Sequence, residues 1–225
     1  SLNREPAELL KNFDVAIQEI GQAATFYQGL QIFNDILRFI SRIKSPLDLL
    51  ANAELILKLF GYISSVGLFG QICTLIVNEE NLHTRWEALK TLSYILACLK
   101  VKNETFDGSQ YLQTDEIKFY LTSEEFLFVL LNLTYSQCLE VQEQSRVCVG
   151  YIIQLSEIGR NYFISMNIVT NYHGSLVEGS SDIQLEMISF VLASVATSLP
   201  LNVNYMDTNL LVKFFFMEFG VNGIN

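Results

Sequence analysis

The sequence predicts an all-α fold, and three observations carry this prediction. Apolar residues recur at spacings of three and four along almost the whole chain, and no sustained alternation of the kind found in strands is present. Only three prolines occur in 225 residues, so few positions forbid a helix. Half of the residues are hydrophobic and 17% are charged, so the chain can bury an extensive core and disorder is not expected.

Start and stop signals divide this pattern into successive helices. Gly21 is a suitable C-terminal residue for the first helix. Ser45 and Pro46 open a later helix, because serine caps a helix and proline fits its first turn. "TSEE" at 122–125 and "SDIQ" at 181–184 have the pattern of capping boxes, and Pro200 follows the second of the two helices. We expect helices over about 6–20, 25–43, 46–64, 68–78, 82–99, 126–136, 140–157, from 160, 182–198 and 207–219.

A polar segment interrupts the helical pattern in the middle of the chain. Residues 101–116, "VKNETFDGSQYLQTDE", lack apolar periodicity and are predicted to form a loop insertion. Long loops in compact helical arrays are often either functional or merely disordered, so this insertion is a further candidate site with disorder as the alternative.

Several helices repeat one another. Gly61-Tyr62-Ile63, Ser93-Tyr94-Ile95 and Gly150-Tyr151-Ile152 fall together when three helices are aligned, at offsets of 32 and 57 residues. A fourth helix aligns through Ile183-Gln184 with Val141-Gln142, at an offset of 42. Removing roughly fifteen inserted residues from the longest offset brings it to about 42, within the period of armadillo and HEAT repeats.

The stretch "VQEQSRVCVGYII", residues 141–153, resembles the third helix of an armadillo repeat. That helix opens with a hydrophobic residue and polar residues, followed by a small residue and apolar residues four and seven positions later. The three places are filled by Ser145, Val149 and Ile152, by Ala88, Leu92 and Ile95, and by Ile56, Phe60 and Ile63.

The similarity to the armadillo superfamily covers about residues 50–198 and points to no particular protein. It implies one domain over 1–225, folded as a right-handed superhelical array of armadillo/HEAT-like repeats. The expected parts are an irregular hairpin over 5–44, repeat units over 45–65, 66–100, 117–157 and 158–199, and a capping helix over 206–219.

The resemblance also implies a concave groove lined by the third helices. Two positions four residues apart face this groove, and in peptide-binding armadillo proteins they carry Trp and Asn. Here the matching pairs are Lys58 and Tyr62, Lys90 and Tyr94, Val147 and Tyr151, and Ser189 and Ala193. The absence of the Asn ladder argues against an importin-type receptor for basic peptides.

A row of tyrosines would replace that ladder. Tyrosine offers a large contact area at little entropy loss, plus one hydroxyl. Basic side chains beside them would favour an acidic or mixed-charge peptide. We expect eight residues to contact a partner: Lys58, Tyr62, Arg85, Lys90, Tyr94, Arg146, Tyr151 and Gln154. The competing interpretation of each tyrosine is a residue at the edge of the core.

Catalytic and ligand-binding patterns are missing. His83 and His173 are the only histidines, and neither has a Cys or carboxylate at metal-ligand spacing. Nucleophile-elbow, P-loop and zinc-protease motifs do not occur. We therefore expect a protein that is not an enzyme and uses no cofactor or metal.

Charge, hydropathy and cysteine usage limit the possible partners and the cellular location of the chain. The net charge of −10 argues against nucleic-acid binding, and no apolar run approaches the ~20 residues of a membrane span. Cys73, Cys98, Cys138 and Cys148 lie in apolar helical runs without pairing motifs, which predicts buried free thiols. Free thiols favour the cytoplasm or nucleus.

These features predict a non-enzymatic protein–protein interaction module that acts as a scaffold or adaptor. The alternative is structural assembly, such as a homodimer, through "LLVKFFFMEF" at 210–219. Four phenylalanines there cannot all point inward from one helix: Phe214, Phe215, Phe216 and Phe219. A third and weaker alternative is a chaperone cofactor that promotes nucleotide exchange, as some armadillo proteins do.

Overall fold

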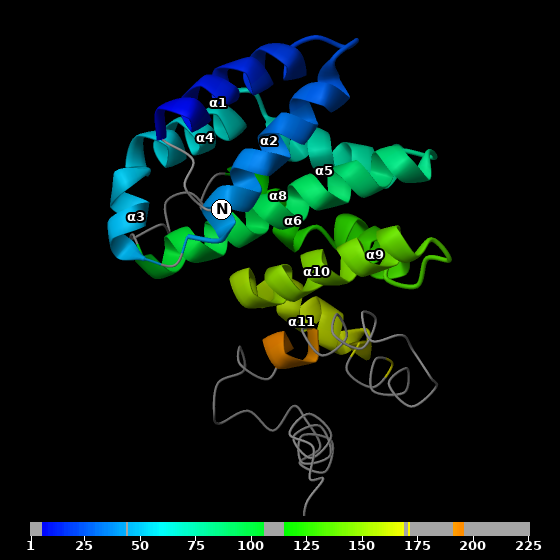
Figure 1. The fold of residues 1–225 in the computed structure, drawn as a ribbon. Helices are drawn as coiled ribbons and strands as arrows, with labels where there is room; N and C mark the ends of the chain where they lie inside the picture. The colour runs from blue at the N-terminus through cyan, green and yellow to red at the C-terminus, as the bar shows by residue number, and fades with distance from the viewer. Residues whose placement is uncertain (1–5, 44, 106–114, 169–170, 172–190, 196–225) are drawn as a thin grey trace, which may run out of the picture.

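The fold is all-helical throughout the part of the chain that the computed structural model describes, which is residues 6–43, 45–105, 115–168, 171 and 191–195 (Figure 1). The predicted all-α class is therefore confirmed. Residues 191–195 are also helical. The other helices are α1 (Pro6–Ile20), α2 (Phe26–Ser41), α3 (Pro46–Ala51), α4 (Ala53–Ser65), α5 (Leu68–Asn78), α6 (Leu82–Thr105), α8 (Asp115–Thr122), α9 (Glu124–Leu133), α10 (Leu139–Leu155) and α11 (Glu157–Ser165).

Three helices far apart in sequence, α2, α6 and α10, form a row down the molecule (Figure 1). The central helix α6 packs against α2 on one side and α10 on the other. A buried thiol contact recurs at both interfaces. Cys98 Sγ donates to the carbonyl of Leu37 at 3.3 Å, and Cys148 Sγ donates to the carbonyl of Leu89 at 3.4 Å. Neighbouring helices of the row therefore meet in a similar way.

A second set of helices supports this row. Each row helix packs against the helix that precedes it: α1 with α2, α5 with α6, and α9 with α10. Helix α4 contacts both α1 and α5, and α8 contacts both α5 and α9. The sequence alignment gave residues 56–63 the same role as the row helices. The contacts instead give α4 a place like that of α8, and α2 is the helix that packs along α6.

One continuous hydrophobic core runs through these layers, from Leu9 to Val195. Its largest fully buried side chains include Phe33, Phe69 and Phe126, each from a different helix pair. Burial of such a side chain stabilises a fold by about 1.5–3 kcal/mol. The helices are therefore held by shared packing rather than by their own propensity.

The helix expected over 46–64 is broken in two at Asn52. The Asn52 side chain donates from Nδ2 to the carbonyl of Asp48 at 2.8 Å, which gives the backbone an alternative to a continuing helix. A second bend, of 60°, separates α4 from α5. It includes Gly67, whose φ of 63° is left-handed and favours glycine.

The expected loop over 101–116 is shorter than its composition indicated. Helix α6 continues to Thr105, and α8 begins at Asp115. No glycine or proline occurs before Gly108, so nothing in "VKNET" stops the helix. Glu116 also has a structural role, because its Oε1 accepts a hydrogen bond from the Gly70 backbone at 3.1 Å and ties α8 to α5. Residues 106–114 lie outside the described part.

The helix starts differ from the predictions by one to three residues. Ser123, not Thr122, caps α9 and accepts from the Phe126 N–H at 3.4 Å. Thr122 ends α8 and donates to the carbonyl of Lys118 at 2.8 Å. Ser156 caps α11, which begins before the expected start after Gly159. The capping box at 181–184 and the helix at 207–219 lie outside the described residues.

Candidate functional site

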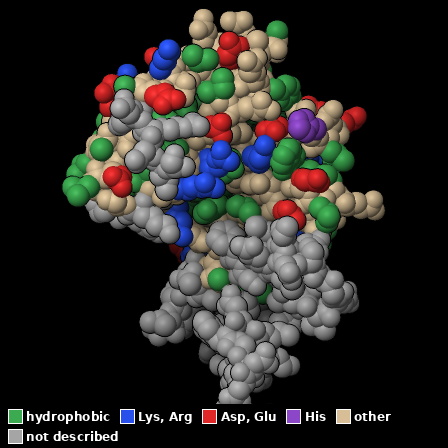
Figure 2. Space-filling view, in the orientation of Figure 1, with side chains coloured by type: hydrophobic (Ala, Val, Ile, Leu, Met, Phe, Trp, Pro, Cys, Tyr) green, Lys and Arg blue, Asp and Glu red, His purple; other side chains and the backbone are tan. Residues whose placement is uncertain are grey.

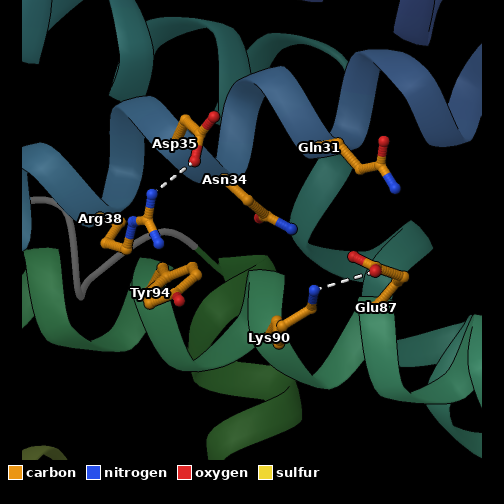
Figure 3. A pocket seen from close by; sticks show the side chains of 7 residues that line it. All are labelled: Gln31, Asn34, Asp35, Arg38, Glu87, Lys90 and Tyr94. Carbon is orange, nitrogen blue, oxygen red and sulfur yellow. Dashed lines mark hydrogen bonds and ion pairs between the residues drawn. The ribbon is translucent and has the colours of Figure 1, made fainter.

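A pocket of about 220 Å³ opens between α2 and α6 (Figure 3). Its lining residues recur at three- and four-residue spacing, so each helix presents successive turns of one face. The lining from α2 consists of Gln31, Asn34, Asp35 and Arg38, and that from α6 of Glu87, Lys90 and Tyr94. The two predicted site residues Lys90 and Tyr94 therefore lie together on its α6 wall.

The four charged residues of the pocket form two ion pairs. Arg38 Nη2 lies 2.9 Å from Asp35 Oδ1 at the exposed rim on α2. Lys90 Nζ lies 2.9 Å from Glu87 Oε1 on α6, where Glu87 is buried. The charges cancel, so the pocket as a whole favours neither an anion nor a cation. The space-filling view shows Lys and Arg side chains grouped near the centre of this face (Figure 2).

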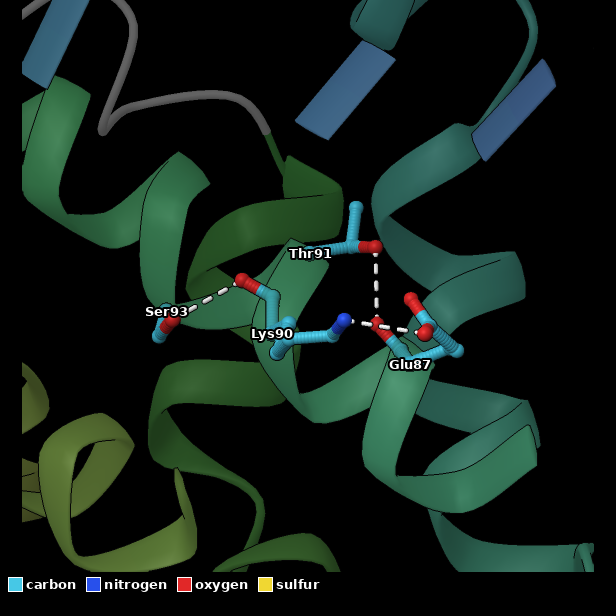
Figure 4. A network of polar contacts seen from close by, with 4 residues as sticks. All are labelled: Glu87, Lys90, Thr91 and Ser93. Carbon is cyan, nitrogen blue, oxygen red and sulfur yellow. Dashed lines mark hydrogen bonds and ion pairs between the residues drawn. The ribbon is translucent and has the colours of Figure 1, made fainter. Parts of the chain in front are cut away.

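Lys90 is held in place by more than its carboxylate partner. Its Nζ lies 3.8 Å from the centroid of the Trp86 ring, a cation–π contact. The Thr91 hydroxyl donates to the Glu87 carbonyl at 3.0 Å, and the Ser93 hydroxyl donates to the Lys90 carbonyl at 2.8 Å (Figure 4). The α6 wall is thus a preorganised polar surface.

Three buried polar atoms in the pocket have no hydrogen-bond partner among the described residues. They are Asn34 Nδ2, Asn34 Oδ1 and Glu87 Oε2. Asn34 is 6% exposed and Glu87 is 4% exposed. A buried polar atom without a partner costs about 1–3 kcal/mol. Each of the three atoms has less than 1 Å² of accessible surface, so a ligand or water that pairs with them must first displace the side chains that cover them.

Tyr151 belongs to the same row of helices. It lies half-buried on α10 against the core. Burial raises the pKa of its hydroxyl, and the nearby thiols of Cys98 and Cys148 raise it further. Val147 and Ala193, the other expected groove positions in the described part, are also half-buried, and Ser189 lies outside it.

Lys58 and Tyr62 lie apart from the pocket. The Tyr62 ring contacts Phe13 edge-on, with centroids 6.0 Å apart, and Phe33 at 6.1 Å. Burial raises the pKa of Tyr62. Lys58 Nζ forms an exposed ion pair with Glu54 at 3.1 Å on the same helix. Tyr62 therefore joins the packing among α1, α2 and α4.

The remaining predicted contact residues take internal positions. Arg146 is buried. Burial raises the pKa of Tyr135, and the positive charge of Arg146 acts in the other direction and lowers it. Gln154 Nε2 donates to Ser194 Oγ at 2.6 Å and ties α10 to the helical residues 191–195. Arg85 is half-buried in the first turn of α6. The phenylalanines Phe214, Phe215, Phe216 and Phe219 lie outside the described residues.

The sequence prediction missed the α2 half of the pocket, because the first hairpin had no assigned role. It also missed Glu87, because the repeat alignment placed only Lys90 and Tyr94 at the groove positions of that helix. One signal was available. Asn34 interrupts an apolar stripe that includes Leu30, Phe33 and Leu37, all buried. A polar residue at a core position is more informative than an exposed one.

Within the described ranges, no cluster of three His, Cys, Asp or Glu side chains could hold a metal ion. No single described helix has the length and hydropathy of a membrane span, although the bent pair α4 and α5 together meets that test.

Comparisons with protein families, curated proteins and solved structures gave no significant match for this chain.

Proposed function

We propose that this chain is a non-enzymatic protein-interaction module that binds a peptide segment of a partner along α2, α6 and α10. The observation that carries the proposal is the pocket between α2 and α6, which includes Lys90 and Tyr94 and contains buried polar atoms without partners. Catalysis would need a reactive constellation, and the sequence offers none.

The proposal includes an armadillo-like arrangement of repeats. Helices α4, α5 and α6 would form one three-helix unit, and α8, α9 and α10 the next. The matching contacts of α4 and α8, and the repeated thiol-to-carbonyl contact, support this arrangement. Neighbouring packed helices lie about 8–10 Å apart, so an extended peptide would advance about two to three residues per helix.

The chemistry of the face suits a peptide of mixed charge. Arg38 and Lys90 offer positive charge beside the carboxylates of Asp35 and Glu87. Tyr94 adds aromatic contact area. The buried free thiols of three cysteines are consistent with the cytoplasm or nucleus as the setting for this interaction.

Peptide selection followed by mutagenesis tests the proposal. Random peptides displayed on phage would be selected on the purified chain, and the dissociation constant of a selected peptide measured by fluorescence polarisation. We expect Tyr94→Ala to weaken binding about tenfold or more, because a buried aromatic contact is lost. Tyr27→Ala, an exposed tyrosine on α2 outside the pocket lining, is the matched control. Failure to select any peptide, or equal losses in both variants, would contradict the proposal.

Assembly is the second candidate function, and three exposed leucines on α3 and α4 favour it. Leu47, Leu50 and Leu57 are 77%, 61% and 57% exposed. Light scattering across a concentration series measures the mass directly. A dimer that Leu47→Asp together with Leu50→Asp converts to a monomer would support assembly through these leucines, and a monomer at all concentrations would exclude it.

A further inference from the structure

The pocket between α2 and α6 contains a specific set of unused hydrogen-bonding groups. Asn34 contributes one donor, Nδ2, and one acceptor, Oδ1, and Glu87 contributes one acceptor, Oε2. Both side chains are more than nine-tenths buried and line the pocket. In Figure 3 the Asn34 amide points from α2 into the space between the two helices.

We infer that this pocket recognises a primary carboxamide, presented as a Gln or Asn side chain of the bound peptide. A carboxamide has one carbonyl acceptor and two N–H donors. Its carbonyl can accept from Asn34 Nδ2, one N–H can donate to Asn34 Oδ1, and the second N–H can donate to Glu87 Oε2. The amide pairing with Asn34 holds for either orientation of the Asn34 side chain.

Other ligand groups leave part of this set unmet. A carboxylate has no donor and would place negative charge beside Glu87. A guanidinium has five donors but no acceptor for Asn34 Nδ2, and it would add positive charge near Arg38 and Lys90. A peptide backbone amide has one donor and one acceptor, so Glu87 Oε2 would remain unpaired. The neutral carboxamide alone among these matches all three atoms.

The size and the walls of the pocket agree with this ligand. A volume of about 220 Å³ equals roughly seven water molecules at about 30 Å³ each, enough for a Gln side chain with some retained water. Tyr94 lines the same pocket and offers an apolar ring surface for the methylene groups. The charges are already paired, so the ligand need supply none.

A small probe tests this inference without requiring a peptide partner. The chain labelled with 15N would be titrated with N-acetyl-glutamine methylamide, and the side-chain amide signal of Asn34 followed by NMR. Its disappearance in Asn34→Leu assigns the signal. The control probe is N-acetyl-glutamate methylamide, which has the same shape but a carboxylate.

We expect a saturable shift of the Asn34 signal with the glutamine probe and a dissociation constant at least about tenfold weaker for the glutamate probe. Asn132→Asp changes an exposed amide on α9 and should leave binding unchanged. Equal affinity for the two probes, or no saturable shift because only water fills the pocket, would overturn the inference.

This inference rests on the proposed function for the source of the carboxamide, yet the two can fail separately. If the chain binds selected peptides but not the probe, the peptide-binding function stands and the carboxamide site is wrong. If it binds the probe but no peptide, the carboxamide site stands and the peptide-binding function is wrong.

Discussion

Asn34 occupies a position in α2 that an amphipathic helix fills with an apolar side chain. Its neighbours Leu30, Phe33 and Leu37 all belong to the core. A buried amide without partners lowers stability, and natural proteins accept such losses where binding needs them. The same reasoning applies to Glu87, whose Oε2 is unpaired on the facing helix. Binding and stability are therefore expected to oppose each other at this site.

Asn34→Leu should raise the stability of the chain while removing the proposed recognition. Leucine has a similar volume and removes two unpaired buried atoms, so we expect the free energy of unfolding to rise by about 1–3 kcal/mol. Urea denaturation followed by circular dichroism measures this change. Asn132→Leu, at an exposed position on α9, is expected to have little effect. A loss of stability in Asn34→Leu would show that Asn34 has partners that this account lacks.

The buried thiols predict how stability depends on pH. Burial raises the pKa of Cys98 and Cys148 above the ordinary value of 9.0. Unfolding returns these thiols to water, where they ionise near pH 9, so the unfolded state binds fewer protons than the folded state above that pH. This contribution to stability is complete below about pH 8 and declines as the pH rises past about 9.

The urea midpoint measured from pH 7 to pH 10 tests this dependence. A midpoint that stays level or rises above about pH 9 would contradict the burial of these thiols.

At the scale of the helices, close approach decides which substitutions the fold accepts. The first hairpin depends on Gly29 of α2, which passes α1 at very short range. A Cβ added there would lie 2.6 Å from the Ile20 nitrogen and 2.9 Å from the Ala16 carbonyl oxygen. Both are backbone atoms, so they cannot move aside as a flexible side chain could. Gly29 therefore sets the distance between α1 and α2, and with it the position of the α2 wall of the pocket.

Gly29→Ala and Gly61→Ala should have opposite effects. At Gly29 the added methyl group forces α1 and α2 apart, and we expect a loss of about 1–3 kcal/mol in the free energy of unfolding. At Gly61 on α4 no atom lies within 4 Å of the added Cβ, so the better helix propensity of alanine should stabilise the chain by about 0.5–1 kcal/mol. Urea midpoints of the two variants provide the comparison, and equal effects would contradict the described packing of α1 on α2.

At the scale of the whole molecule, periodicity predicted the helices well and their assembly less well. Helix α1 has the predicted bounds, because a glycine and an unbroken apolar stripe define it. The break at Asn52 was missed, because it depends on one side-chain hydrogen bond to Asp48. Helix α2 was predicted, but its place beside α6 was missed for a different reason. Pairing of helices 40 or more residues apart depends on three-dimensional packing that a local pattern does not contain.

The candidate site was predicted in part, with two of the seven lining residues named from the sequence. Lys90 and Tyr94 followed from the repeat alignment, and both line the pocket. Tyr62 was aligned with them but packs against Phe13 and Phe33, because α4 has a different place among the helices. In the sequence Asn34 stands out as a polar residue within an apolar stripe, but its missing partners are a property of the assembled interface.

The most direct test of the central claim is to locate a bound peptide on the chain. A selected peptide carrying a photoreactive group would be cross-linked to the wild-type chain, and the labelled residues identified by mass spectrometry. The account predicts labels on α2 and α6 around the pocket that contains Asn34, Lys90 and Tyr94. Labels confined to the exposed leucines of α3 and α4 would contradict it and place the interaction there instead.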